Sequence, residues 1–123
     1  MITDVLLSLK KTRAIKKVVK LTLEYADTER CIQAYKELYD CLHSFPLLKG
    51  LCDEFNFTFD DFYTYSNKLR ALGLTDAHQD WPYVSIFCFP APLSYFLVHK
   101  EEFDWLRSAA EIYQFVGKVL QFM

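Results

Sequence analysis

The residues best suited to chemistry in this chain of 123 are its four cysteines and three histidines. Two groups contain the residue types that bind metals: Cys41-x-His43 with Cys52, and His78-x-Asp80 with His99. A structural zinc site normally shows two closely spaced ligand pairs, and neither group has that form. We therefore predict no metal site and no cofactor.

Motifs for catalysis and phosphate binding are also missing from the sequence. A loop that cradles phosphate needs several neighbouring glycines, whereas the three glycines of this chain are far apart. No G-x-S-x-G nucleophile elbow occurs. The acidic pairs Asp60-Asp61 and Glu101-Glu102 each fall in the first turn of a predicted helix, where capping and the helix dipole explain them. We predict that the protein is not an enzyme.

Bulk composition predicts a single globular domain over residues 1–123. Apolar residues make up 52% of the chain and 21 residues are aromatic, which is enough to build a large core. The four cysteines have no paired spacing, and the apolar run at the start precedes its positive charges, the reverse of a signal peptide. We expect reduced, buried thiols in a cytoplasmic protein.

One segment is strongly basic. Residues 10–20 carry six positive charges and no acid; because the whole chain carries −2, the rest carries −8. Four of these residues follow each other at steps of three, four and three, as one stripe of a helix: Lys10, Arg13, Lys17 and Lys20. The stripe is either a solvated face or a binding site for phosphate or an acidic protein. No large aromatic residue interleaves with it, so we predict no membrane binding.

A second notable stretch is uncharged and runs from Trp81 to Val98, with three prolines and many aromatic residues. The prolines argue against a membrane span, and the β-branched and aromatic content predicts a two-stranded β hairpin near 83–98. Both faces of the first strand would be apolar. Either the protein's own helices cover both faces, or a partner covers one of them.

Apolar periodicity predicts about five helices around this hairpin, in a mainly α fold with a small β element. The expected ranges are 2–25, 28–43, 46–55, 59–72 and 100 to the C-terminus. Within 2–25, the apolar series that contains Val5, Leu6 and Leu9 is out of phase with a later one, which indicates a bend near Lys11 or two helices meeting there. Caps are predicted at Asp27, Pro46, Thr58 with Asp61, and Gly73.

The succession of helix 46–55, a short turn, the capped helix 59–72 and two strands resembles a winged helix-turn-helix over residues 46–98. The resemblance implies that 59–72 is a recognition helix and that the Trp81–Val98 strands form the wing. It suggests a DNA- or RNA-binding transcriptional regulator that uses the basic stripe for phosphates. The acidic start of helix 59–72 and the uncharged wing favour protein binding instead.

The function expected first is therefore protein binding by occlusion, in an inhibitor, an immunity factor or a phage- or plasmid-type regulatory protein. Large aromatic side chains dominate binding hot spots. The predicted protein-binding surface, called here the aromatic set, consists of Trp81, Tyr83, Phe87, Phe89 and Tyr95. A homodimer could form through the same surface.

Overall fold

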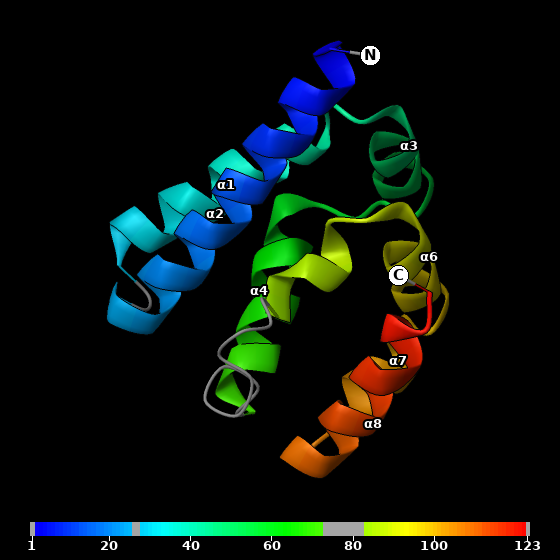
Figure 1. Cartoon of the computed structure of the whole chain (residues 1–123). Coiled ribbons are helices and arrows are strands. Elements are labelled where there is room, and N and C mark those ends of the chain that lie inside the picture. The colour runs from blue at the N-terminus through cyan, green and yellow to red at the C-terminus, as the bar shows by residue number, and fades with distance from the viewer. Residues whose placement is uncertain (1, 26–27, 73–82, 123) are drawn as a thin grey trace.

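The protein is entirely helical in the residues that the computed structural model describes, which are 2–25, 28–72 and 83–122 (Figure 1). Those residues form seven α-helices and one 3-10 helix. The elements are α1 (Ile2–Tyr25), α2 (Glu29–Leu42), α3 (Pro46–Glu54), α4 (Phe59–Ala71), η1 (Tyr83–Phe87), α6 (Pro90–Val98), α7 (Lys100–Trp105) and α8 (Ala109–Leu120).

The hairpin predicted near 83–98 is wrong, and with it the winged-helix-like arrangement over 46–98. Residues 83–87 form the 3-10 helix and residues 90–98 form α6, and the described part of the chain contains no strand. Pro90 and Pro92 lie in the first turn of α6, where a missing backbone N–H costs nothing. Burial of the following apolar residues then outweighs their β propensity, which depends strongly on context.

The predicted N-terminal helices are confirmed in outline. Helix α1 runs from Ile2 to Tyr25 as one helix rather than two, and Pro46 begins α3. The cap of α2 is Thr28, whose hydroxyl accepts a hydrogen bond from the backbone N–H of Cys31 at 3.2 Å. The predicted cap at Asp27 is therefore wrong by one residue, and the predicted cap at Gly73 lies outside the described residues.

The capping box at the start of α4 is confirmed. The Thr58 hydroxyl accepts a hydrogen bond from the Asp61 backbone N–H, and the Asp61 carboxylate accepts one from the Thr58 backbone N–H. Both bonds satisfy backbone donors that the helix itself leaves without partners.

Replacing Thr58 with alanine is expected to lower the free energy of unfolding by about 1 kcal/mol, because the cap is lost. Thr64→Ala is the matched control, since Thr64 is exposed in the middle of the same helix. That control should change stability little or raise it slightly, because alanine has the higher helix propensity. Urea denaturation of the two variants measures the difference, and equal stabilities would contradict the capping role.

The single C-terminal helix expected from Lys100 onward is wrong, because two helices form. Helix α7 ends at Trp105, Leu106 is extended, and Ser108 caps α8 by accepting a hydrogen bond from the Glu111 backbone N–H. The sequence carries this signal as S-x-x-E at 108–111, the spacing of a capping box. Ala109 and Ala110, in the first turn of α8, are exposed.

The helices surround one hydrophobic core to which every element contributes. Helices α1 and α2 lie side by side along one edge of the molecule, α4 lies next to them, and α6, α7 and α8 gather on the opposite side (Figure 1). Residues 84–87 of η1 and the following Cys88 are all buried. The protein's own helices therefore cover these five residues, whereas Val98 at the end of the stretch is 64% exposed. None of the described helices has the length and apolar character to cross a membrane.

Candidate interaction surface on helix α1

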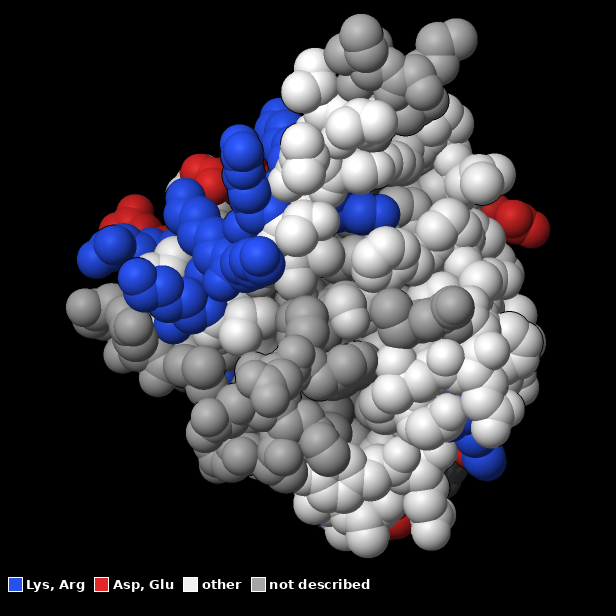
Figure 2. All heavy atoms as spheres, in the orientation of Figure 1, with Lys and Arg blue, Asp and Glu red and all other residues white. Residues whose placement is uncertain are grey.

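The basic stripe is exposed on α1 as a compact patch. Figure 2 shows positive side chains gathered on one part of the surface, on the side of the molecule where Figure 1 places α1. Its members, called here the basic half of α1, are the exposed residues Lys10, Arg13, Lys16, Lys17 and Lys20. They lie opposite the residues that α1 buries, Ile15, Val18 and Leu21. The helix thus separates a core face from a charged outward face.

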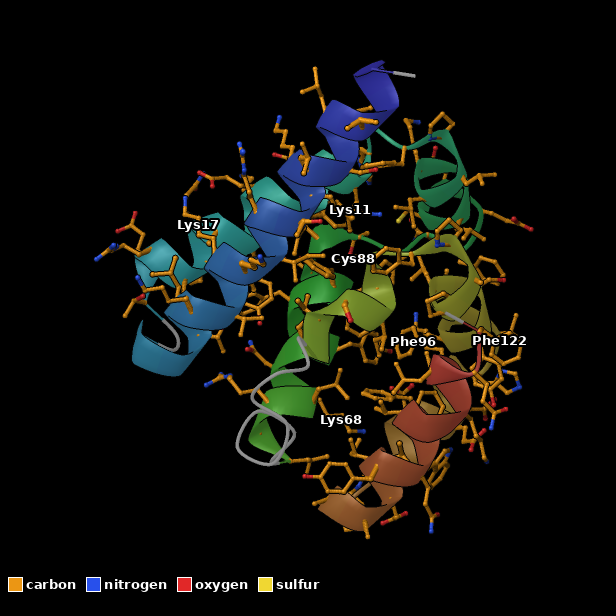
Figure 3. The ribbon with its side chains drawn as sticks, viewed as in Figure 1. Lys11, Lys17, Lys68, Cys88, Phe96 and Phe122 are labelled. Atoms are coloured by element: carbon orange, nitrogen blue, oxygen red, sulfur yellow. The ribbon has the colours of Figure 1, made fainter. Side chains whose placement is uncertain are left out.

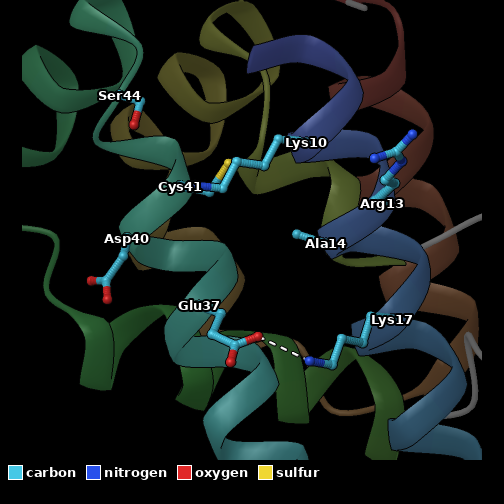
Figure 4. A pocket seen from close by; sticks show the side chains of 8 residues that line it. All are labelled: Lys10, Arg13, Ala14, Lys17, Glu37, Asp40, Cys41 and Ser44. Atoms are coloured by element: carbon cyan, nitrogen blue, oxygen red, sulfur yellow. Dashed lines mark hydrogen bonds and ion pairs between the residues drawn. The ribbon is translucent and has the colours of Figure 1, made fainter. Parts of the chain in front are cut away.

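One edge of this patch borders a groove between α1 and α2. The groove has a volume of about 510 Å³, and Figure 4 shows α1 and α2 forming its two walls. Across it, the Lys17 ammonium and the Glu37 carboxylate form an ion pair of 3.0 Å, in which both side chains are about half exposed. Lys10 and Arg13 line the α1 wall together with Lys17, and Asp40 adds a second acid to the α2 wall, so the groove carries both charges.

The sixth basic residue, Lys11, points the other way. It is 7% exposed, and its ammonium donates a hydrogen bond of 3.0 Å to the backbone carbonyl oxygen of Cys88. The same nitrogen lies 4.5 Å and 4.1 Å from the ring centres of Phe45 and Phe89. Figure 3 shows Lys11 directed from α1 toward the region of Cys88, whereas Lys17 lies on the other side of the helix.

Lys11 therefore holds α1 against the rest of the protein with a buried charge. Desolvation lowers the pKa of its ammonium, an effect that the neighbouring Cys88 and Cys41 oppose. The carbonyl oxygen and the two ring faces replace part of the lost hydration. Sequence reasoning counted Lys11 only as part of a charged run. Its spacing of four from Ile15 and seven from Val18 was the available signal that it faces inward.

The first turns of α1 present an apolar surface beside the basic half. Val5, Leu6 and Leu9 are 57%, 61% and 49% exposed, respectively. A shallow hollow of about 300 Å³ lies among Val5, Ser8, Leu9 and Thr12. We call Val5, Leu6 and Leu9 the apolar half of α1. The phase break in the apolar series signalled this change, because the later series faces the core and the earlier one faces outward.

The aromatic set is not gathered on one surface in the described residues. Phe87 is fully buried and packs edge-to-face on Phe62 and Phe96, so it is a core residue. Phe89 is half-buried beside Lys11, and Tyr95 is half-buried with its ring 4.1 Å from that of His99. Trp81 and the side chain of Tyr83 lie outside the described residues, and their role in binding stays a prediction.

The cysteines are all free and buried, as expected for thiols that pack as small apolar groups. Burial raises the pKa of the Cys52 thiol to about 11 and raises the pKa of Cys41 and Cys88 as well. Protonated thiols are poor nucleophiles and poor metal ligands. Among the described residues, no three side chains of histidine, cysteine or acid form a metal-binding cluster; His78 and Asp80 lie outside them.

The surface chemistry of the described residues thus points to α1. Its outward face offers an apolar half followed by a basic half, whereas the thiols are protected by burial. No protein-family model matches this chain, and no curated protein or solved structure matches it significantly.

Proposed function

We propose that this protein is a non-enzymatic protein-binding module that acts by occlusion and docks an acidic partner on the outward face of α1. The observation that carries the proposal is the concentration of five exposed cations on one helix, in a chain whose net charge is −2. Charge segregated in this way accelerates encounter with a partner of opposite charge and fixes its orientation.

The basic half is well placed to bind a partner because its side chains are exposed and take no part in the hydrophobic core. Of the six basic residues at 10–20, Lys11 is the buried one, and its ammonium contacts the Cys88 carbonyl oxygen. The five other basic residues project from the exposed side of the same helix. A partner laid over α1 would cover several turns of helix at once. Occlusion of the partner's own acidic surface is the expected mechanism.

Nucleic acid is the second candidate, because the same five cations could contact phosphates. Two features of the surroundings favour a protein. Glu37 and Asp40 line the adjacent groove and would repel a regularly spaced phosphate backbone. The apolar half of α1 gives phosphates nothing to bind, whereas a protein can match both charge and apolar surface.

Neutralising the basic half should remove the partner. The variant Lys10→Gln/Arg13→Gln/Lys20→Gln is expected to recover roughly tenfold to a hundredfold less partner from an extract of the native host, if each lost contact contributes about 0.5–1 kcal/mol. Quantitative mass spectrometry of the recovered proteins, with and without nuclease treatment, measures the loss. Recovery that vanishes on nuclease treatment would favour the nucleic-acid candidate.

The control variant is Lys36→Gln/Lys49→Gln/Lys118→Gln, which removes the same charge from exposed positions on α2, α3 and α8. Two of these lysines form exposed ion pairs, Lys49 with Asp53 and Lys118 with Glu102, whose loss costs little. This control should keep its partner. An equal loss from both variants would show a net-charge effect and contradict docking on α1.

A further inference from the structure

We propose that the partner segment is an amphipathic helix that lies antiparallel to α1, with its acidic half first and its apolar half last. This inference rests on the proposed function and adds the chemistry and direction of the partner. It starts from the order in which α1 presents its two halves, apolar near the N-terminus and basic toward the C-terminus.

The two halves form one continuous stripe on the outside of the helix. Its members follow each other at steps of three, four, three and four: Leu6, Leu9, Arg13, Lys16 and Lys20. At a rise of 1.5 Å per residue, Leu6 and Lys20 are roughly 21 Å apart along the axis. A single partner helix of about 18 residues, roughly 27 Å long, can therefore cover the apolar and basic halves together.

The apolar half requires apolar partner residues. Leu6 and Leu9 expose 61% and 49% of their surface, and Val5 exposes 57%, beside a shallow hollow. Apolar side chains grouped in this way near a polar rim mark a contact site rather than an ordinary surface. Leucine or phenylalanine side chains spaced three and four residues apart on a helix would fill the hollow and cover these residues.

Electrostatics sets the direction of the partner helix. Its acidic residues must lie over Arg13, Lys16 and Lys20, and acidic residues are favoured near the N-terminus of the helix that carries them. A partner helix whose acidic half comes first therefore begins over the C-terminal part of α1 and ends over its N-terminal part. The antiparallel arrangement also opposes the two helix dipoles.

Two other occupants fit less well. A second copy of α1 laid antiparallel would place the basic half of each copy on the apolar half of the other, so the exposed cations of both copies would face leucine and valine side chains. An anionic lipid surface would require the apolar residues to line the full length of the helix. Here Lys16 and Lys20 continue the same stripe as Leu6 and Leu9, so a flat-lying helix could not insert one without the other.

The test uses three stapled helical peptides of about 18 residues with one composition of glutamate and leucine. One has its glutamates first and its leucines last, the second has the reverse order, and the third intersperses them. Fluorescence anisotropy against the full chain is expected to rank the first peptide tightest. The expected margin is about fivefold over the reversed peptide and tenfold over the interspersed one.

Variants of the protein show which of its residues give the first peptide its higher affinity. Leu6→Ser/Leu9→Ser should remove the preference for the first peptide. Leu47→Ser/Val98→Ser should keep it, because those residues are more exposed than Leu6 and Leu9, at 71% and 64%, but lie on α3 and α6. Vesicles of phosphatidylserine, added in place of peptide, should not bind the wild-type chain.

The outcomes separate this inference from the proposed function. Equal binding of all three peptides, lost in Lys10→Gln/Arg13→Gln/Lys20→Gln, would overturn the ordered amphipathic partner and leave the acidic partner intact. Binding of vesicles that is lost in Leu6→Ser/Leu9→Ser would overturn the inference in favour of a lipid surface. Failure of every peptide to bind would also overturn it, while recovery of partner from host extract judges the proposed function independently.

Discussion

Replacing Phe96 with alanine is expected to lower the free energy of unfolding by about 3–5 kcal/mol. The Phe96 ring is fully buried in α6 and packs on five other rings, which belong to Phe57, Tyr65, Phe87, Phe103 and Phe115. All five contacts are edge-to-face, a geometry that aromatic pairs prefer. Alanine would leave a cavity that rings from several helices cannot fill without moving.

Trp105→Ala is the control, because Trp105 is also a large aromatic residue but is 71% exposed at the end of α7. Its loss should change stability by less than about 1 kcal/mol. Denaturant unfolding followed by far-UV circular dichroism measures both variants. A loss at Phe96 no larger than that at Trp105 would contradict the arrangement of the core.

Replacing Lys11 with glutamate is expected to lower the free energy of unfolding by about 3–5 kcal/mol, because it buries a charge without a partner. A carboxylate at this site would face the carbonyl oxygen of Cys88 and the negative ring faces of Phe45 and Phe89. The ammonium of the native lysine meets the same three groups favourably.

Two variants control for this effect. Lys10→Glu makes the same chemical change one residue away, on the exposed side of the helix, and should change stability by less than about 1 kcal/mol. Lys11→Met removes the charge but keeps the apolar stem, and should fall within about 1.5 kcal/mol of the wild type. Chemical denaturation compares the three variants. A Lys11→Glu protein as stable as Lys10→Glu would contradict the buried ammonium.

The sequence predicted those helices whose ends are set by local interactions. Thr58 with Asp61 and the proline at 46 act within one turn of the helix they begin, so neighbouring residues suffice to identify them. The hairpin predicted for 83–98 is wrong because β propensity depends on the tertiary contacts of a segment, which the sequence of that segment does not contain. Pro90 starts α6 in the way Pro46 starts α3, and the same signal applied equally to both.

The candidate surface was predicted in part. Helical spacing is a property of one element, and it placed Lys10, Arg13, Lys17 and Lys20 on one exposed stripe. What the other side of α1 contacts depends on residues far away in the chain. Spacing alone can place Lys11 on the inward side of α1, but its hydrogen bond is to a carbonyl 77 residues further along, and no local pattern predicts that contact.

The exposure of the apolar half of α1 was also missed. Val5, Leu6 and Leu9 follow a helical apolar pattern that would normally indicate a buried face. In this protein the face is turned outward, because the register of α1 is set by Ile15, Val18 and Leu21. A helix with two apolar series in different phases can bury only one of them against a single core.

An acetylation footprint of lysines tests docking on α1 most directly. The protein is recovered from its native host with its partner bound, treated with nuclease, labelled with an acetylating reagent, and compared with the free protein by mass spectrometry. Protection of Lys10, Lys16 and Lys20 from labelling, with Lys36 and Lys49 labelled as in the free protein, is the expected result. Unchanged labelling along α1 in a complex that protects Lys36 or Lys49 would contradict docking on this helix.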